Sequence, residues 1–227
     1  MQERIEAIYE HDYAGHRPDP VFEERVRAAI RAEIRPLVAP PGRVLDVGCG
    51  SGAFLQAMDE QGYAAEGIDI SAEVISRVRA MGLAARLGDF LTIDFDEPFD
   101  LVTFWDVIEH LRDPSAFLGR ARALLRPGGL LVAKTPGFGS GSFLAAAVYE
   151  RFASTILSAP CHVQYFNPAS METALRCAGF KEVIWFESRA FRGKAEGGTV
   201  RRRVGRALST AVGRISGNAN LYLAARA

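Results

Sequence analysis

Short apolar runs alternate with segments of helical period through the centre of this chain, from Arg43 to Pro136. Each run is short enough to be a buried strand, and each is followed by apolar residues at helical spacing. This alternation is typical of an α/β protein in which helices connect parallel strands. We therefore predict a doubly wound, Rossmann-like, mostly parallel seven-stranded sheet. The predicted strands lie in or near Val44–Val47, Gly67–Ser71, Ala85–Phe90, Phe99–Leu111, Leu124–Pro136, Lys181–Glu187 and Asn220–Ala225.

The pattern differs on either side of this central part. Residues 1–39 form a helical preface in which Val26, Ile30 and Ile34 recur at helical spacing, and a Pro-Pro-Gly sequence ends it. After the fifth strand, a Gly/Ser hinge and a mostly apolar helix are predicted within an insertion. The predicted organisation is an N-terminal helical lid, 1–42, and one domain, 43–227, which carries the insertion near 137–167 and a basic segment near 189–214.

The segment between the first strand and its helix is rich in glycine. Gly48, Gly50 and Gly52 allow a tight turn and a close approach of a ligand, because glycine has no Cβ. In an open α/β sheet the ligand binds at the carboxyl ends of the strands, where this turn lies. Asp46 would repel a pyrophosphate but attract the ammonium and sulfonium groups of S-adenosylmethionine. A dinucleotide is the alternative, because the segment also fits G-x-G-x-x-G/A with an acidic residue, Asp69, about 20 positions on.

The motif D-x-G-x-G-x-G at Asp46–Gly52 resembles the first motif of class I S-adenosylmethionine-dependent methyltransferases, including those of ubiquinone and small-metabolite biosynthesis. GIDIS, ARLGDF, FDLVTFWDVIEHL and LLRPGGLLVAKTP follow in the order of that family's later motifs. The resemblance implies an antiparallel last strand beside the sixth, S-adenosyl-L-methionine as cofactor and S-adenosylhomocysteine as product. It places the ribose hydroxyls on Asp69 and the adenine amino group near Asp89, with Phe90 or Leu91 against the ring. The cofactor-binding residues so implied are Asp46, Gly48, Gly50, Gly52, Asp69, Ile70, Asp89, Phe90 and Trp105.

The preface contains a polar and aromatic cluster, YEHDYAGHR at residues 9–17, of the kind that covers clefts. Similar enzymes fold an N-terminal helix over the cofactor. By that resemblance Tyr13 lies near the methionyl end and Arg17 pairs with the cofactor carboxylate. A solvated helix face with two packed tyrosines is the alternative.

Two histidines are the candidate catalytic residues. His110 follows the fourth strand in an E-H pair that resembles one often found there in small-metabolite methyltransferases, and His162 lies in HVQYFNP after the insertion. Asn167 is expected to cap the next helix, because Pro168 suits a first turn. Either imidazole would be a general base for a hydroxyl nucleophile. The alternatives are a capping role for His110 and a hydrogen-bonding role for His162. No metal is expected, because alignment of the reactants contributes much of the catalysis.

Composition narrows the compartment and the partners. The 227 residues suit one α/β domain with additions, and 48% are hydrophobic, as in proteins that bury a core. The formal net charge is zero, which does not favour nucleic acid as a partner. Three cysteines at unrelated spacings argue against a disulfide framework or zinc site and fit the cytoplasm. Neither a signal peptide nor a membrane-spanning segment is expected.

The predicted activity is methyl transfer to a small organic acceptor, at oxygen by the resemblance of the E-H pair. An apolar or aromatic wall suits such an acceptor, and its candidates are Trp105, Phe138, Phe143, Leu144, Tyr149 and Phe152. The arginines of the basic segment leave a tRNA or a lipid open as acceptor, as well as peripheral membrane binding. Transfer to nitrogen or carbon also stays open, as does a cofactor-binding partner subunit without catalysis.

Overall fold

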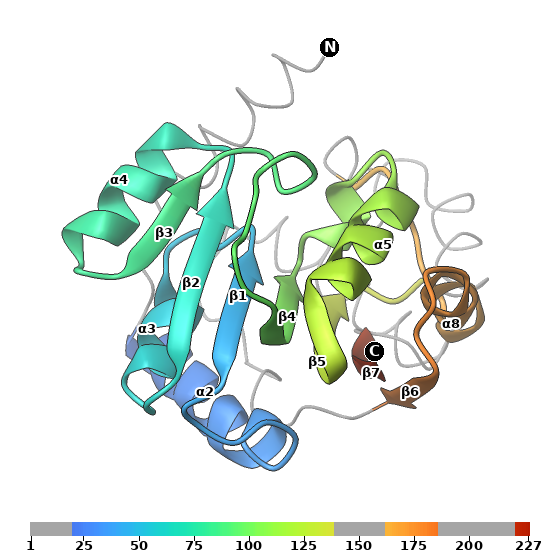
Figure 1. The fold of residues 1–227 in the computed structure, drawn as a ribbon, viewed down its shortest axis with the longest axis horizontal. Helices are drawn as coiled ribbons and strands as arrows, with labels where there is room; N and C mark the ends of the chain where they lie inside the picture. The colour runs from blue at the N-terminus through green and yellow to red at the C-terminus, as the bar shows by residue number, and fades with distance from the viewer. Residues whose placement is uncertain (1–19, 139–161, 186–220) are drawn as a thin grey trace, which may run out of the picture.

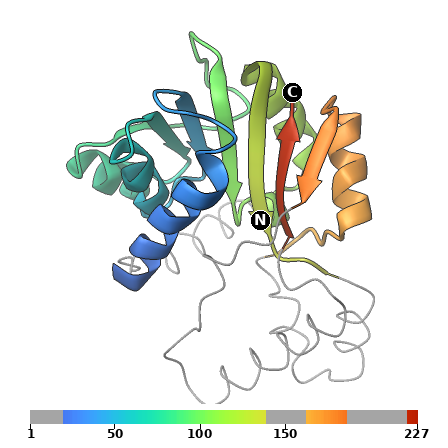
Figure 2. The same ribbon diagram turned by 90° about the horizontal axis from the view of Figure 1, so that it is seen from below.

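Seven strands form a single sheet in the order β3-β2-β1-β4-β5-β7-β6 (Figure 1). The computed structural model describes residues 20–138, 162–185 and 221–227. The strands are β1 (Arg43–Val47), β2 (Ala64–Asp69), β3 (Ala84–Leu87), β4 (Phe99–Trp105), β5 (Leu125–Thr135), β6 (Glu182–Trp185) and β7 (Leu221–Arg226). β7 lies between β5 and β6 and is antiparallel to both, whereas the other neighbouring pairs are parallel (Figure 2). The predicted sheet and its antiparallel last strand are confirmed.

Helices cover both faces of this sheet (Figure 1). Leu45 in β1 belongs to the core that α5 and α8 complete, while its neighbour Val44 belongs to the core that α2, η1 and α3 complete. A smaller cluster packs α4 against α3. Parallel strands buried on both faces need near-continuous apolar runs, which is why the sequence shows them. The helical elements are α2 (Pro20–Ala29), the π-helical turn η1 (Ile30–Ile34), α3 (Ala53–Asp59), α4 (Ala72–Ala80), the 3₁₀ turn η2 (Ile108–His110), α5 (Pro114–Leu124) and α8 (Pro168–Cys177).

α2 and η1 pack into the core of the protein. Val26, Ile30 and Ile34 are at most 2% exposed and pack with α3 and the sheet. Apolar side chains at helical spacing form one stripe, and burying that stripe permanently is favourable. The described part of this preface is therefore a packed layer, and the lid over the cofactor stays a prediction. Residues 1–19 lie outside the described residues.

Two further local predictions can be compared with the structure. The strand predicted within Leu124–Pro136 contains Pro127 and two glycines, and Arg126–Gly129 forms a bulge inside β5, since Leu125 pairs with Phe99 and Leu130 with Leu101. Asn167 caps α8 as expected: its side chain accepts from the Ser170 N–H at 2.9 Å, in a reciprocal capping box.

The ends of the predicted insertion meet at the sheet. The chain leaves β5 at Gly137, which forms a parallel bridge with Phe166, and the N–H of Phe138 donates to the Phe166 carbonyl at 2.8 Å. The predicted apolar helix of the insertion and the basic segment near 189–214 lie outside the described residues. Within the described residues, none of the helices is both long and apolar enough to cross a membrane.

Candidate active site

The glycine-rich loop lies at the carboxyl ends of β1 and β2. Gly48, Gly50 and Gly52 have φ of +70°, +49° and +77°, a region that residues with a Cβ rarely adopt. The Gly48 N–H donates to the carbonyl of Ile68 at 2.8 Å, which ties the loop to β2. A Cβ on Gly48 would lie 2.7 Å from Cγ2 of Val107, so the loop also packs closely on the turn after β4. The conformation of this loop therefore requires glycine at these positions.

Asp69 is held beside this loop at the end of β2. Its Oδ1 accepts from the Ser71 N–H at 2.9 Å and its Oδ2 from the Gly50 N–H at 3.3 Å. Burial raises the pKa of Asp69, and these backbone hydrogen bonds oppose that shift. An ionised carboxylate has about four acceptor sites, so both oxygens retain capacity for further donors.

Asp46 lies beneath the loop rather than at its surface. Its side chain is 2% exposed, and the Thr103 hydroxyl in β4 donates to Oδ1 at 2.7 Å. Burial raises the pKa of Asp46 to about 7, the Thr103 hydrogen bond opposes the rise, and the charge of Asp69 adds to it. The two neighbouring acidic groups, Asp46 and Asp69, make the region unfavourable for a phosphate.

The residues predicted to face an adenine ring divide into exposed and buried ones. Asp89 is exposed, and its Oδ1 accepts from the Leu91 N–H at 2.9 Å. Phe90 is 3% exposed, and its ring packs against Phe104 with centroids 5.9 Å apart. The Phe90 side chain is therefore part of the core, and its contact with the adenine ring stays a prediction. The exposed apolar side chains in this region include Ile70, at 61%, Leu87, at 48%, and Leu91, at 36%.

Trp105 is the remaining predicted cofactor residue that the structure describes. Trp105 ends β4, is half-buried and packs on Phe54 with ring centroids 5.1 Å apart. Tyr13 and Arg17 lie outside the described residues, so their roles stay predictions.

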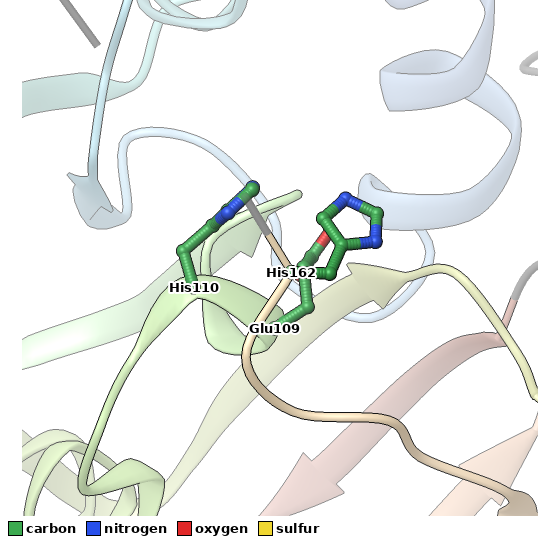
Figure 3. Close-up of side chains that lie close together, drawn as sticks. All are labelled: Glu109, His110 and His162. Atoms are coloured by element: carbon green, nitrogen blue, oxygen red, sulfur yellow. The ribbon is translucent and has the colours of Figure 1, made fainter. Parts of the chain in front are cut away.

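The structure brings the two predicted catalytic histidines together (Figure 3). His110 belongs to η2, just after β4, and His162 lies on the segment that returns from the insertion. Their ring centroids are 4.9 Å apart at an interplanar angle of 73°. The Glu109 carbonyl accepts from the N–H groups of Val163 and Gln164, both at 2.9 Å, and so fixes the returning segment to η2.

Glu109 is the buried acid of this cluster. It is 1% exposed, and the Thr135 hydroxyl in β5 donates to its Oε2 at 2.9 Å. Burial, and then the charge of Asp106, raise the pKa of Glu109 to about 8. Burial, and then the charge of His110, lower the pKa of His162 to about 4. Near neutral pH both Glu109 and His162 are therefore mainly uncharged.

The same three side chains could hold a metal ion. Ligand atoms of Glu109, His110 and His162 all lie within 4.8 Å of one another. Imidazole and carboxylate are ligands of Zn²⁺ and of several other divalent cations, and binding would release a proton from Glu109. From the sequence, Glu109 was not selected as a metal ligand and no metal was expected. The absence of a metal stays a prediction.

Lys134 is the site residue that sequence reasoning missed. Its ammonium pairs with both carboxylate oxygens of Asp106, which follows β4. The sequence does contain a sign of this ion pair, because Lys134 is a lone charge inside the apolar run LLVAKT of the fifth strand. A lysine in a buried strand usually has an acidic partner.

Comparison with known proteins shows relatives with the same architecture. A family model described as "Methyltransferase domain" matches residues 21–184. A ubiquinone biosynthesis O-methyltransferase from Xylella fastidiosa (strain 9a5c) is 31% identical over 147 residues, which cover 60% of each chain. One from Bradyrhizobium sp. (strain ORS 278) is 37% identical over 112 residues, 47% of this chain and 44% of the relative. The matches thus span about 60% or less of these relatives' length.

Solved structures extend the likeness of the fold over nearly the whole chain. A SAM-dependent methyltransferase from Archaeoglobus fulgidus superposes with a TM-score of 0.63 at 22% identity, covering 98% of this chain and 99% of the other. Phosphoethanolamine N-methyltransferase 2 from Haemonchus contortus, in complex with S-adenosylmethionine, gives a TM-score of 0.65 at 20% identity, covering 88% and 51%. Together with the glycine loop and the strand order, these matches establish that the chain belongs to the class I S-adenosylmethionine-dependent methyltransferases.

Proposed function

We propose that this methyltransferase acts on an oxygen atom of a small organic acceptor and that His110 takes the proton of the acceptor hydroxyl. The observation that carries the proposal is the convergence of His110 and His162 on buried Glu109, in the turn that packs on the cofactor loop. The names of the relatives from Xylella fastidiosa and Bradyrhizobium sp., both O-methyltransferases of ubiquinone biosynthesis, support transfer to oxygen.

The residues around the glycine loop fit S-adenosylmethionine. Among the described residues, the nearest atom to a Cβ built on Gly50 is a backbone oxygen 3.9 Å away, which leaves room for a ligand to approach the loop. Asp69 has acceptor capacity for two ribose hydroxyls, and Ile70 and Leu91 are apolar and exposed beside it. When bound, the cofactor supplies a methyl group activated by a sulfonium. Tyr13 and Arg17 are proposed to cover its methionyl end.

The two histidines are proposed to have different roles. A ring with a pKa near 4 has little tendency to hold a proton at neutral pH, so His162 is a poor general base. As a neutral ring packed on His110, it orients its neighbour and excludes water from one side. His110 is the last residue of η2, the turn after β4. Its side chain is half-buried, so an acceptor can reach it.

A comparison of His110→Asn with His162→Asn tests this division. The proteins are assayed for S-adenosylhomocysteine release with panels of hydroxyl, amine and carbon acceptors, and the methylated atom is located with a ¹³C-labelled methyl group. At saturating cofactor, His110→Asn should lower turnover by about 10²- to 10⁴-fold, while His162→Asn should cost less than about tenfold. Cofactor affinity measured by calorimetry should change little in either variant.

Three results would contradict the proposal. Methylation at nitrogen or carbon would overturn the choice of atom. Full turnover in His110→Asn would leave alignment as the main source of catalysis. Loss of turnover in a chelator, restored by a divalent cation, would make His110 and His162 metal ligands instead of base and neighbour.

A further inference from the structure

A lysine interrupts the otherwise apolar strand β5 close to the candidate active site. Leu130–Ala133 are buried, whereas the Lys134 side chain is 20% exposed. Its ammonium bonds both carboxylate oxygens of Asp106, whose side chain is 39% exposed. Partial burial of a charge within a sheet is unfavourable unless the charge is paired. The position of Lys134 is therefore tied to Asp106.

Asp106 has an unusual backbone conformation. Its φ is +54°. Among the described residues, Asp106 is the only non-glycine residue with a positive φ. Aspartate adopts this left-handed region more readily than most residues, but the surroundings still have to stabilise it. The Asp106 N–H donates to the Lys134 carbonyl at 2.9 Å. Lys134 therefore holds Asp106 through the main chain and the side chain together.

The left-handed residue sets the direction of the turn that carries the site. Val107 follows it and packs against Gly48. Glu109 and His110 come next, and the Glu109 carbonyl holds the segment on which His162 lies. The same segment is also bound to the chain that leaves β5, through the bridge between Gly137 and Phe166. Because the segment does not follow the turn freely, a change of φ at Asp106 would move His110 relative to His162.

We propose that Lys134 is a positioning residue of the methyl-transfer site. Its ion pair with Asp106 holds the turn after β4 in the left-handed conformation and thereby sets the His110 ring against the His162 ring. The catalytic consequence rests on the proposed function of His110, whereas the positioning itself does not.

The cofactor loop is fastened independently of Lys134. The N–H groups of Gly48 and Cys49 donate to the carbonyl of Ile68, at 2.8 and 3.2 Å, and that of Gly50 donates to Asp69. Loss of the ion pair should therefore affect turnover more than cofactor affinity. This difference separates positioning from a general loss of structure.

Four variants of the full chain test the proposal. Lys134→Met removes the charge and keeps the side-chain length, and Lys134→Arg keeps the charge. The double variant Lys134→Met/Asp106→Gly removes the pair but supplies a residue that adopts positive φ without support. Arg126→Met is the matched control, because Arg126 pairs with Asp100 at 2.6 Å at the opposite end of the same two strands.

The first measurement is the nuclear Overhauser effect between the His110 and His162 rings, which needs no acceptor. We expect it to be lost in Lys134→Met and retained in Lys134→Arg, in the double variant and in Arg126→Met. The second is the turnover with an acceptor that the wild-type protein methylates, at saturating cofactor. Lys134→Met should lower it by about 10- to 100-fold, with an S-adenosylhomocysteine Kd within about threefold of wild type, and the double variant should recover it.

An unchanged ring–ring effect in Lys134→Met would overturn the proposal, as would a double variant that fails to restore it. Restoration of the ring contact without recovery of turnover would show that the Asp106 carboxylate itself is needed and would reject a purely positioning role. If the wild-type protein methylates no oxygen acceptor, the proposed function fails while the ring measurement still decides whether Lys134 positions the turn.

Discussion

Asp46 shows how one buried carboxyl couples the stability of the protein to its cofactor site. Its neighbours are the Thr103 hydroxyl and, nearby, a second carboxylate, Asp69. Because burial disfavours the charged form, folding favours the protonated side chain, and its pKa rises to about 7. A cation bound in the loop would favour the ionised form instead.

The pH dependence of stability tests the burial of Asp46. Its pKa is higher in the folded than in the unfolded chain, so its stabilising contribution is present below about pH 4 and is lost as the pH rises toward 7. Relative to wild type, Asp46→Asn should gain stability over this interval, by on the order of a few kcal/mol, with no further change above it. Denaturant unfolding of the cofactor-free proteins at several pH values measures the difference. A constant difference from pH 4 to 8 would show that Asp46 is ionised throughout.

Asp69 is expected to contribute to cofactor affinity through its carboxylate. Asp69→Asn removes the charge and part of the acceptor capacity that the proposed ribose contact uses, so affinity for S-adenosylhomocysteine should fall by about 10- to 100-fold. Asp94→Asn is a control, since Asp94 is an exposed aspartate with no proposed cofactor role. Calorimetric titration gives both affinities. Equal affinities for wild type and Asp69→Asn would reject the ribose role.

At the scale of elements, the loop after β1 and the turn after β4 form one packed unit. Gly48 requires glycine for two reasons: its φ is positive, and a Cβ at this position would overlap Val107. Gly82, at the end of α4, also has positive φ, +81°, but a Cβ there would meet nothing within 4 Å. The two glycines therefore separate conformational strain from steric overlap.

Gly48→Ala and Gly82→Ala should differ accordingly. Both pay a conformational cost of about 1–2 kcal/mol in the free energy of unfolding. The free energy of unfolding of Gly48→Ala should fall by about 1–3 kcal/mol more than that of Gly82→Ala, because the added methyl group overpacks against Val107. Gly48→Ala should also weaken cofactor binding. Denaturant unfolding and calorimetry measure the two effects. Equal losses in the two variants would mean that the turn after β4 moves aside without cost.

At the scale of the whole molecule, the order of the strands assembles the site. β1 and β4 are neighbours at the centre of the sheet, and the chain reverses its winding between them, so the cofactor loop and the His110 turn meet at one edge. Ligands of open α/β sheets bind at this place. β7 then separates β5 from β6 and completes the sheet beside Lys134, which pairs in register with Tyr222.

Ligand binding should therefore stabilise the whole chain. At about 100 times its Kd, S-adenosylhomocysteine adds about 2.7 kcal/mol to the free energy of unfolding, which corresponds to a rise in Tm of about 5–10 °C for a chain of this size. NAD at the same concentration should have no effect, and Asp69→Asn should reduce the rise. Differential scanning calorimetry measures all three. A rise with NAD alone would contradict the cofactor assignment.

The strands, the glycine loop and the helix cap at Asn167 could be predicted from the sequence, because each depends on local chemistry. Apolar runs such as Phe99–Trp105 are the direct consequence of burial on both faces of a sheet, and Gly48 and Gly52 are required by positive φ wherever the loop lies. Asn167 and Pro168 specify a helix start within a few residues. The order of the family's motifs then indicated the sheet and its cofactor.

The face that each side chain takes and the contacts between distant residues could not be predicted, because they depend on how the strands assemble. Phe90 belongs to the core and Asp46 lies beneath the loop, because the pleat and the neighbouring strands direct their side chains. The grouping of His162 with Glu109 spans the insertion, and the pairing of Lys134 with Asp106 joins two strands. Such contacts depend on strand order and register, and no short stretch of sequence contains that information.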